Sequence, residues 1–211
     1  MSNFSIKVKS IEWELYEMGQ TVAAQMENVK DVLFEDRSKT IVKELIERDK
    51  EVDQKDNRIH SSIIHLIILQ PPLPEELRAL TMMMRIAREF ERIGDQVVNI
   101  AEIRIESDVD NLKLYTSEAF EKGYIKMLQL SGKMMAETLE AMTNKDRDLK
   151  GQIEQLDEEV DDLFFYLQHQ IVQDMKESPG IIEKLAPLFL VIRYVERMAD
   201  HVVNVSRRLR E

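Results

Sequence analysis

Acidic side chains recur at helical spacing in this sequence, and they are the residues best suited to carry chemistry. Two carboxylates at positions i and i+4 of a helix point about 40° apart, so such a pair can chelate or bridge a hard cation. The chain has no cysteine, so any metal must be held chiefly by carboxylate oxygens. Eight acids form four pairs of this kind: Asp49 and Asp53, Glu91 and Asp95, Asp157 and Asp161, and Glu196 and Asp200.

The recurrence of these pairs is more informative than any single pair. With 40 acidic residues in 211 positions, about seven such pairs are expected from composition alone. However, the block from Arg88 to Asn99 matches the block from Arg193 to Asn204 at seven of twelve positions. The aspartates at 49 and 53 likewise match those at 157 and 161. The sequence is therefore predicted to be a duplication with one set of four carboxylates in each copy.

The elements that position these acids are predicted to be long helices. The chain has only six glycines and five prolines, and 33% of its residues are charged, which is typical of solvated helices. Apolar residues recur every three or four positions between the breakers. We expect helices over about 4–34, from the turn at 35–38 to the prolines at 71–74, and over 75–106, 116–142 and 146–177, with a last helix after 178–180 that ends at 210.

This pattern predicts an all-α fold of two tandem three-helix bundles, over residues 1–107 and 112–211. The polar segment 107–111 is the expected boundary. Helical angles place Glu91 and Glu196 opposite the apolar stripes, on an outer or groove-facing surface, and place Asp49 and Asp157 at the edges of buried stripes. Each site is therefore expected between the second and third helices of its half, supported by Arg88, Asn99, Arg193 and Asn204.

Two interpretations of the acids stay open at this point. Arg88 and Arg193 can neutralise them as salt bridges without any metal, and spacing alone does not decide. If ions are bound, they can be divalent or trivalent and multinuclear, and an all-oxygen ligand set fits magnesium, manganese, calcium or iron better than zinc. His201 is expected to be an exposed helix residue rather than a ligand, and Trp13 and Tyr16 are expected to pack at the end of a bundle.

Composition and missing motifs exclude several classes of protein. A net charge of −11 and a pI near 5.0 argue against binding to nucleic acid. Residues 1–9 do not resemble a signal peptide, and the longest apolar stretch, 63–69, is too short to span a bilayer. We therefore expect a soluble cytoplasmic protein without membrane insertion. The sequence has no Gly-rich phosphate loop, Ser/His/Asp signature or HExxH motif, so it is not expected to be an enzyme.

Two motifs resemble those of a known family. The duplicated Glu-Arg-x-x-Asp-x-x-x-Asn block, with an arginine three residues upstream, and the turn Gln-Pro-Pro-Leu-Pro-Glu-Glu-Leu-Arg at 70–78 are similar to the PhoU phosphate-signalling proteins. The resemblance covers nearly the whole chain. It implies two three-helix bundles with multinuclear iron or zinc clusters at Glu91 and Asp95 and at Glu196 and Asp200.

The same resemblance implies a function. PhoU-like proteins negatively regulate phosphate uptake and the phosphate-starvation response, and they couple the Pst transporter ATPase to a PhoR-type sensor kinase. The chain is expected to reach the membrane through these partners, and its exposed bundle faces suit a homodimer. A regulator of another ion transporter, a carboxylate-bridged metalloenzyme and a metal-free helical adaptor are the alternatives.

Overall fold

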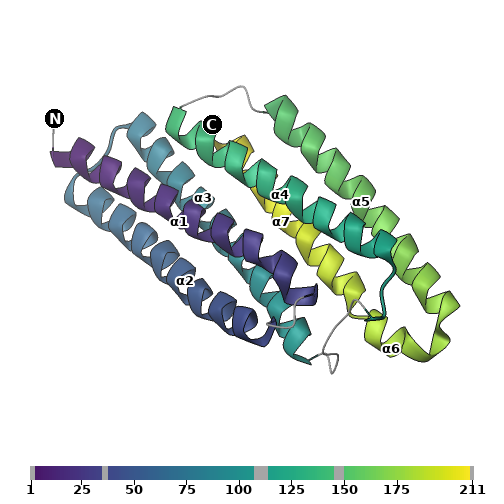
Figure 1. Cartoon of the computed structure of the whole chain (residues 1–211). Helices are drawn as coiled ribbons and strands as arrows, with labels where there is room; N and C mark the ends of the chain where they lie inside the picture. The colour runs from purple at the N-terminus through teal and green to yellow at the C-terminus, as the bar shows by residue number, and fades with distance from the viewer. Residues whose placement is uncertain (1–2, 35–37, 107–113, 145–149, 210–211) are drawn as a thin grey trace.

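The chain folds into long helices, as a computed structural model describes it for residues 3–34, 38–106, 114–144 and 150–209 (Figure 1). All regular structure in these residues is helical, so the prediction of an all-α fold is confirmed. The segment 107–111, expected as the boundary between the halves, lies outside the described residues. The helices are α1 (Asn3–Phe34), α2 (Ser38–Leu69), α3 (Pro74–Glu106), α4 (Glu118–Asn144), α5 (Lys150–Glu177), η2 (Pro179–Ile181), α6 (Ile182–Leu185) and α7 (Leu188–Arg208).

The proline-rich turn separates α2 from α3, as expected. Pro74 is the first residue of α3, where the missing N–H of proline costs no hydrogen bond. Glu76 then reaches back, and its Oε2 accepts a hydrogen bond from the backbone N–H of Leu73 over 2.8 Å. This contact satisfies one of the free N–H groups at the helix end. The chemistry of the turn therefore fixes where the helix that carries Glu91 and Asp95 begins.

The start of α4 is fixed by a serine cap and a buried aspartate. Ser117 Oγ accepts a hydrogen bond from the N–H of Phe120, which caps the first turn. The N–H of Ser117 donates to Asp174 Oδ2 of α5 over 3.0 Å, and Asp174 is buried. The contact ties the first residues of one helix to the last turn of its neighbour.

The last helix is interrupted, which corrects the prediction of one helix from 178–180 to residue 210. The structure instead has the 3₁₀ turn η2, the short α6 and then α7, which begins after Pro187. Proline cannot donate the backbone hydrogen bond that a continuous helix needs at that position. The carboxylates Glu196 and Asp200 lie on α7, beyond this interruption.

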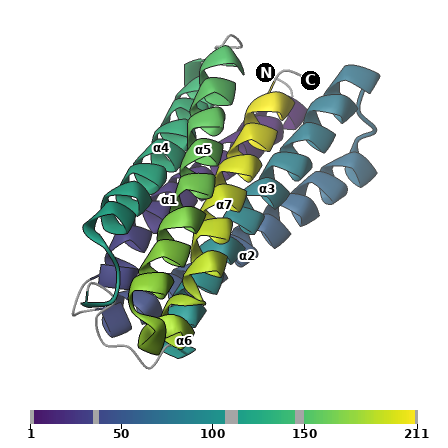
Figure 2. The same cartoon turned by 90° about the vertical axis from the view of Figure 1, so that its right-hand side faces the viewer.

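The helices form two groups that pack along their length. Helices α1, α2 and α3 contact one another, as do α4, α5 and α7, while α3 lies beside α7 and α1 beside α4 (Figures 1 and 2). Gly19 marks the close approach of α1 to α4, because a Cβ there would come within 2.5 Å of Leu139 and 2.9 Å of Phe90. The two groups therefore share one continuous apolar core.

No helix in the described part of the chain has the length and apolar character needed to cross a membrane.

Candidate metal sites

The structure brings the four predicted carboxylates of the first half together between α2 and α3. Burial, followed by the carboxylates of Asp53, Asp95 and Glu91, raises the pKa of Asp49 to about 7, although a hydrogen bond from the Gln25 side chain partly opposes the shift. Burial and the neighbouring Asp53 also raise the pKa of Asp95 above its ordinary value. The four acids therefore form one cluster of negative charge that is unfavourable without a compensating cation or proton. We call Asp49, Asp53, Glu91 and Asp95 the first cluster.

Arg88 supplies part of the compensating charge. Its Nη1 lies 2.7 Å from Glu91 Oε1, and its Nη2 lies 3.4 Å from Oδ2 of Asp56. Asp56 is almost fully buried on α2, and His60 Nδ1 lies 3.2 Å from its Oδ1. Asp56 follows Asp53 by three residues on the same helix and was not among the acids predicted from the sequence.

The second half repeats the arrangement between α5 and α7. Burial, followed by the carboxylates of Asp161 and Asp200, raises the pKa of Asp157 to about 6. Burial and Asp200 also raise the pKa of Glu196 to about 7, although Arg193 Nη1 lies 2.6 Å from Glu196 Oε1. We call the corresponding set the second cluster: Asp157, Asp161, Glu196 and Asp200.

The orientation expected for the third-helix acids is only partly right. Asp95 and Asp200 are exposed, as predicted, but Glu196 is buried, and the side chain of Glu91 is only 18% exposed. Helical angles describe each helix alone, whereas the neighbouring α2 and α5 cover the first acid of each pair. Asp95 and Asp200 are therefore the third-helix acids that face solvent.

An unpaired oxygen of the second cluster fits a bound cation. Glu196 Oε2 is buried and has no hydrogen-bond partner, whereas in the first cluster the Gln25 side chain hydrogen-bonds Asp49. Buried polar atoms are nearly always paired in native proteins, and hard cations such as Mg²⁺, Mn²⁺ or Fe²⁺ bind carboxylate oxygens. Among the residues that the structure describes, however, no three carboxylate or imidazole groups already surround an ion position. Ligation would therefore require side-chain rotation, including release of Glu91 and Glu196 from their arginines.

The second asparagine expected to support a site lies elsewhere. Asn204 Nδ2 donates to Glu89 Oε2 over 3.3 Å, so it faces α3 rather than the second cluster. His201 was expected to be exposed, but its side chain is only 13% exposed. Its Nδ1 lies 2.9 Å from Glu89 Oε2. Asn99, the counterpart of Asn204 in the first half, is half-buried on α3. The spacing shared by the two halves therefore does not place Asn204 at the second cluster.

Glu89 is a buried carboxylate that sequence reasoning missed. Its Oε1 accepts a hydrogen bond from Arg208 Nη2 over 3.1 Å, in addition to the contacts with His201 and Asn204. Burial raises the pKa of Glu89, but the hydrogen bonds from His201, Arg208 and Asn204 outweigh it and hold the pKa at about 2. Glu89 therefore joins α3 of the first half to α7 of the second. Its position in the second repeat is Tyr194, so no repeated pattern marked it.

Comparison with known protein families identifies the family to which this chain belongs. The family model of the PhoU domain matches this chain twice, over residues 15–104 and 124–209. The chain belongs to the PhoU family. Each match contains one complete cluster, so both sets of four carboxylates lie within PhoU domains.

Curated relatives match nearly the full length of the chain. A phosphate-specific transport system accessory protein PhoU homolog of Synechocystis is 28% identical over 208 residues, which are 99% of this chain and 90% of the relative. A protein of the same description from Deinococcus radiodurans is 28% identical over 193 residues, covering 90% of this chain and 86% of the relative.

Solved PhoU structures share the fold. The crystal structure of PhoU from Pseudomonas aeruginosa superposes with a TM-score of 0.87 at 22% identity, covering 98% of this chain and 97% of that one. The phosphate transport system regulatory protein PhoU from Streptococcus pneumoniae gives a TM-score of 0.81 at 24% identity, with coverage of 98% and 95%. The arrangement of six long helices is thus the PhoU arrangement.

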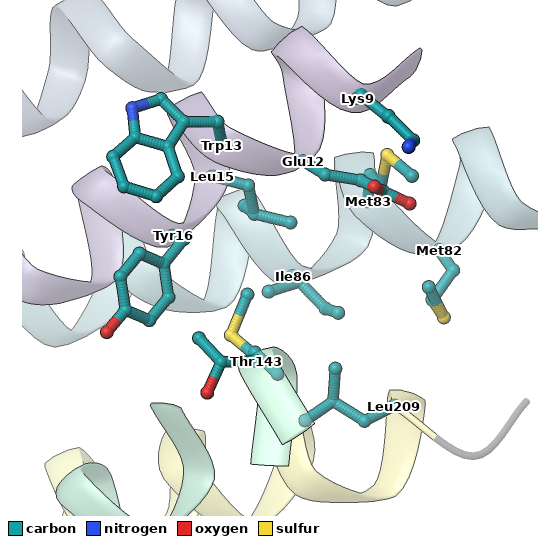
Figure 3. Close-up of a pocket in the computed structure, with 11 residues that line it drawn as sticks. Lys9, Glu12, Trp13, Leu15, Tyr16, Met82, Met83, Ile86, Thr143 and Leu209 are labelled. Carbon is teal, nitrogen blue, oxygen red and sulfur yellow. The ribbon is translucent and has the colours of Figure 1, made fainter. Parts of the chain in front are cut away.

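A separate apolar groove lies away from both clusters, where helices of the two halves meet. Its volume is about 450 Å³, and Figure 3 shows Trp13 and Tyr16 on the α1 side with Leu209 and Thr143 across from them. The Trp13 side chain is 60% exposed, which corrects the prediction that it packs at the bundle end, whereas Tyr16 is partly buried. The ring centroids of the two aromatics lie 5.8 Å apart. An exposed tryptophan beside the partly buried Tyr16 and Met82 suits a protein contact.

Proposed function

We propose that this chain regulates phosphate uptake and the phosphate-starvation response, as a metal-binding helical adaptor between the Pst phosphate transporter and a sensor histidine kinase. The observation that carries the proposal is the PhoU-domain match in both halves. It is supported by full-length relatives that are named accessory proteins of the phosphate-specific transport system. The proposed role is regulatory rather than catalytic.

The metal-binding part of the proposal is supported by the two carboxylate clusters. In each cluster, burial and neighbouring carboxylates raise at least one acid to a pKa of about 7. Such acids gain most from a cation that replaces lost hydration. A bound iron, zinc, manganese or magnesium ion would supply positive charge and link α2 to α3, or α5 to α7. The residues that would hold it are the four acids of each cluster, with Arg88 and Arg193 as the competing cations.

The adaptor part of the proposal is supported by the surfaces that the bundles leave open. Long rigid helices present extended faces, and the groove beside Trp13 offers an apolar site for a partner. A partner such as the transporter ATPase, on the cytoplasmic side of the membrane, would place the chain there without membrane insertion. A homodimer through exposed bundle faces is part of the same proposal and is testable by light scattering of the purified protein.

Affinity capture tests the adaptor role. A tagged chain expressed in its own cell and cross-linked under phosphate-replete conditions should recover the Pst ATPase and a sensor kinase. A second capture uses the same chain carrying Trp13→Glu, which places a charge in the groove. Contact through the groove predicts that this variant recovers less of both partners than the unaltered chain. Recovery of the ATPase of another ion transporter, with no Pst component, would contradict the assignment to phosphate.

A further inference from the structure

The apolar groove beside Trp13 continues along one face of α3. A second hollow, of about 610 Å³, shares Met82 with the groove, and its lining residues all belong to α3: Pro74, Leu77, Arg78, Thr81, Met82 and Arg85. These residues recur at three- and four-residue spacing, so they form a single helix face. The face is about three turns, or 16 Å, long. We call the two hollows together the α3 groove.

The α3 groove has a buried apolar floor and exposed apolar side chains along its edges. Leu15, Met83 and Ile86 line the floor and are buried, and Figure 3 shows Ile86 on the α3 side, between the side chains of α1 and Leu209. Trp13 and Leu77 line the edges, and both are exposed large apolar residues. Exposed apolar surface of this kind, next to a hollow, is typical of a site that another apolar surface covers.

The charges along the α3 groove are opposite in sign to the net charge of the chain. The whole chain carries 29 basic and 40 acidic residues. Among the described residues that line the groove, by contrast, Lys9, Arg78 and Arg85 are basic and only Glu12 is acidic. Arg78 and Arg85 are both exposed and lie two turns apart on α3. The groove therefore attracts acidic side chains that most of the remaining surface repels.

We propose that the α3 groove binds an amphipathic helix of a partner protein, whose apolar side covers the floor and whose acidic side chains face Arg78 and Arg85. Helices that dock in grooves do so through apolar anchors that recur every three or four positions, which matches a face of three turns. An anionic membrane surface fits less well, because it would repel a chain with a net charge of −11. The inference rests on the adaptor part of the proposed function and specifies the chemistry of the segment that the partner presents.

Peptide binding to the full chain, measured through Trp13, tests this inference. Trp13 is the only tryptophan of the sequence, so its fluorescence reports directly on the groove. The probes are two helical peptides of about four turns without tryptophan. They carry the same leucine face and differ only in having glutamate or lysine at the flanking positions. The glutamate peptide should shift the Trp13 emission to shorter wavelength and bind about ten-fold more tightly than the lysine peptide.

Charge reversal on α3 shows whether this preference comes from the groove. Arg78→Glu should abolish the preference for the glutamate peptide or reverse it. The matched control is Lys126→Glu, an exposed cation on α4 that lies about 24 Å along the helix from Met142 and should keep the preference. Circular dichroism checks that both variants are folded. Equal binding of the two peptides to the unaltered chain, or equal behaviour of the two variants, would contradict the inference.

Affinity capture with Arg78→Glu separates the groove from the wider adaptor role. This variant should recover less of the Pst ATPase or the sensor kinase than the unaltered chain. Equal recovery by both would leave the adaptor role standing and contradict the groove as the contact. If the unaltered chain recovers no Pst component but the peptides are still distinguished, the assignment to phosphate transport is contradicted and the groove inference stands.

Two other ligands of the groove are outcomes of the same fluorescence measurement. A shift of the Trp13 emission when the protein concentration alone is raised would show that a second copy of the chain covers the groove. A shift with vesicles of anionic phospholipid, and with neither peptide, would show that a membrane surface covers it. Either result would contradict a partner helix as the bound segment.

Discussion

Glu89 of α3 accepts a hydrogen bond from His201 of α7 over 2.9 Å, across 112 positions of the sequence. The contact joins the two PhoU repeats through their third helices, which lie side by side in Figure 2. Because Glu89 is buried and also contacts Arg208 and Asn204, a cluster of polar side chains fixes how one half sits on the other. The third-helix acids of the two carboxylate clusters thereby lie on one pair of contacting helices.

Replacing Glu89 should destabilise the chain in a pH-dependent way. The pKa of Glu89 is lowered from 4.5 to about 2, so its contribution is fully present above pH 4.5 and is lost as the pH falls toward 2. The shift corresponds to about 3 kcal/mol, and Glu89→Gln should lower the free energy of unfolding by about 1–3 kcal/mol at pH 7. Urea unfolding at pH 7 and pH 3 measures the difference, which should shrink at pH 3. Glu44→Gln on the exposed surface is the control, and equal effects of the two changes would contradict this role.

Asp49→Asn should stabilise the metal-free chain and reduce the stabilisation that added metal gives. The pKa of Asp49 is raised from 3.8 to about 7, so its protonated form favours folding and the benefit is lost as the pH rises through that range. At pH 8 without metal, Asp49→Asn should stabilise the fold by about 1–2 kcal/mol after solvent screening. With Mn²⁺ added, the variant should gain less in melting temperature than the unaltered chain. Asp162→Asn is the control, and destabilisation of the metal-free variant would count against a repulsive cluster.

Two glycines in different surroundings, Gly19 and Gly132, test how closely the two halves pack. Gly19→Ala should cost about 1–3 kcal/mol, because the added Cβ would meet Leu139 and Phe90. Gly132→Ala, which meets nothing within 4 Å in the middle of α4, should stabilise the chain by about 0.5–1 kcal/mol. Thermal unfolding of both variants measures the contrast. A neutral Gly19→Ala would mean that α1 and α4 are less closely packed than described.

Removing the α3 acids of the first cluster should remove metal from that half alone. The double change Glu91→Ala and Asp95→Ala should abolish binding to the first cluster and leave the second cluster occupied, because the clusters share no residue. The exposed acid Glu75, in the first turn of the same helix and far from the cluster, is changed to alanine as the control. Metal content of protein purified without chelator is the measurement. An unchanged content in the first variant would show that its acids are neutralised by Arg88 alone.

The long helices and the four carboxylates of each cluster could be predicted from the sequence. Few breakers and a helical apolar period predicted the long helices, and the repeated carboxylates predicted which acids lie together. Pro187 was overlooked as a breaker, so the last helix was expected to be continuous. The error is local, because a proline one turn into an apolar segment changes a single helix start.

Asp56 and Glu89, which were not predicted, have no acidic counterpart in the second repeat. Asp56 corresponds to Phe164, over whose ring Arg193 lies at 5.7 Å, and Glu89 corresponds to Tyr194. A search for repeated acids could not find them, and their partners come from the packing of distant helices.

Phosphate uptake in cells that lack this gene tests the central claim most directly. Uptake of labelled phosphate should stay high in phosphate-replete medium after deletion, and the unaltered chain should restore its repression. A chain in which Glu91, Asp95, Glu196 and Asp200 are changed to alanine should restore it only in part. Normal repression of uptake in the deletion strain would contradict the proposed function.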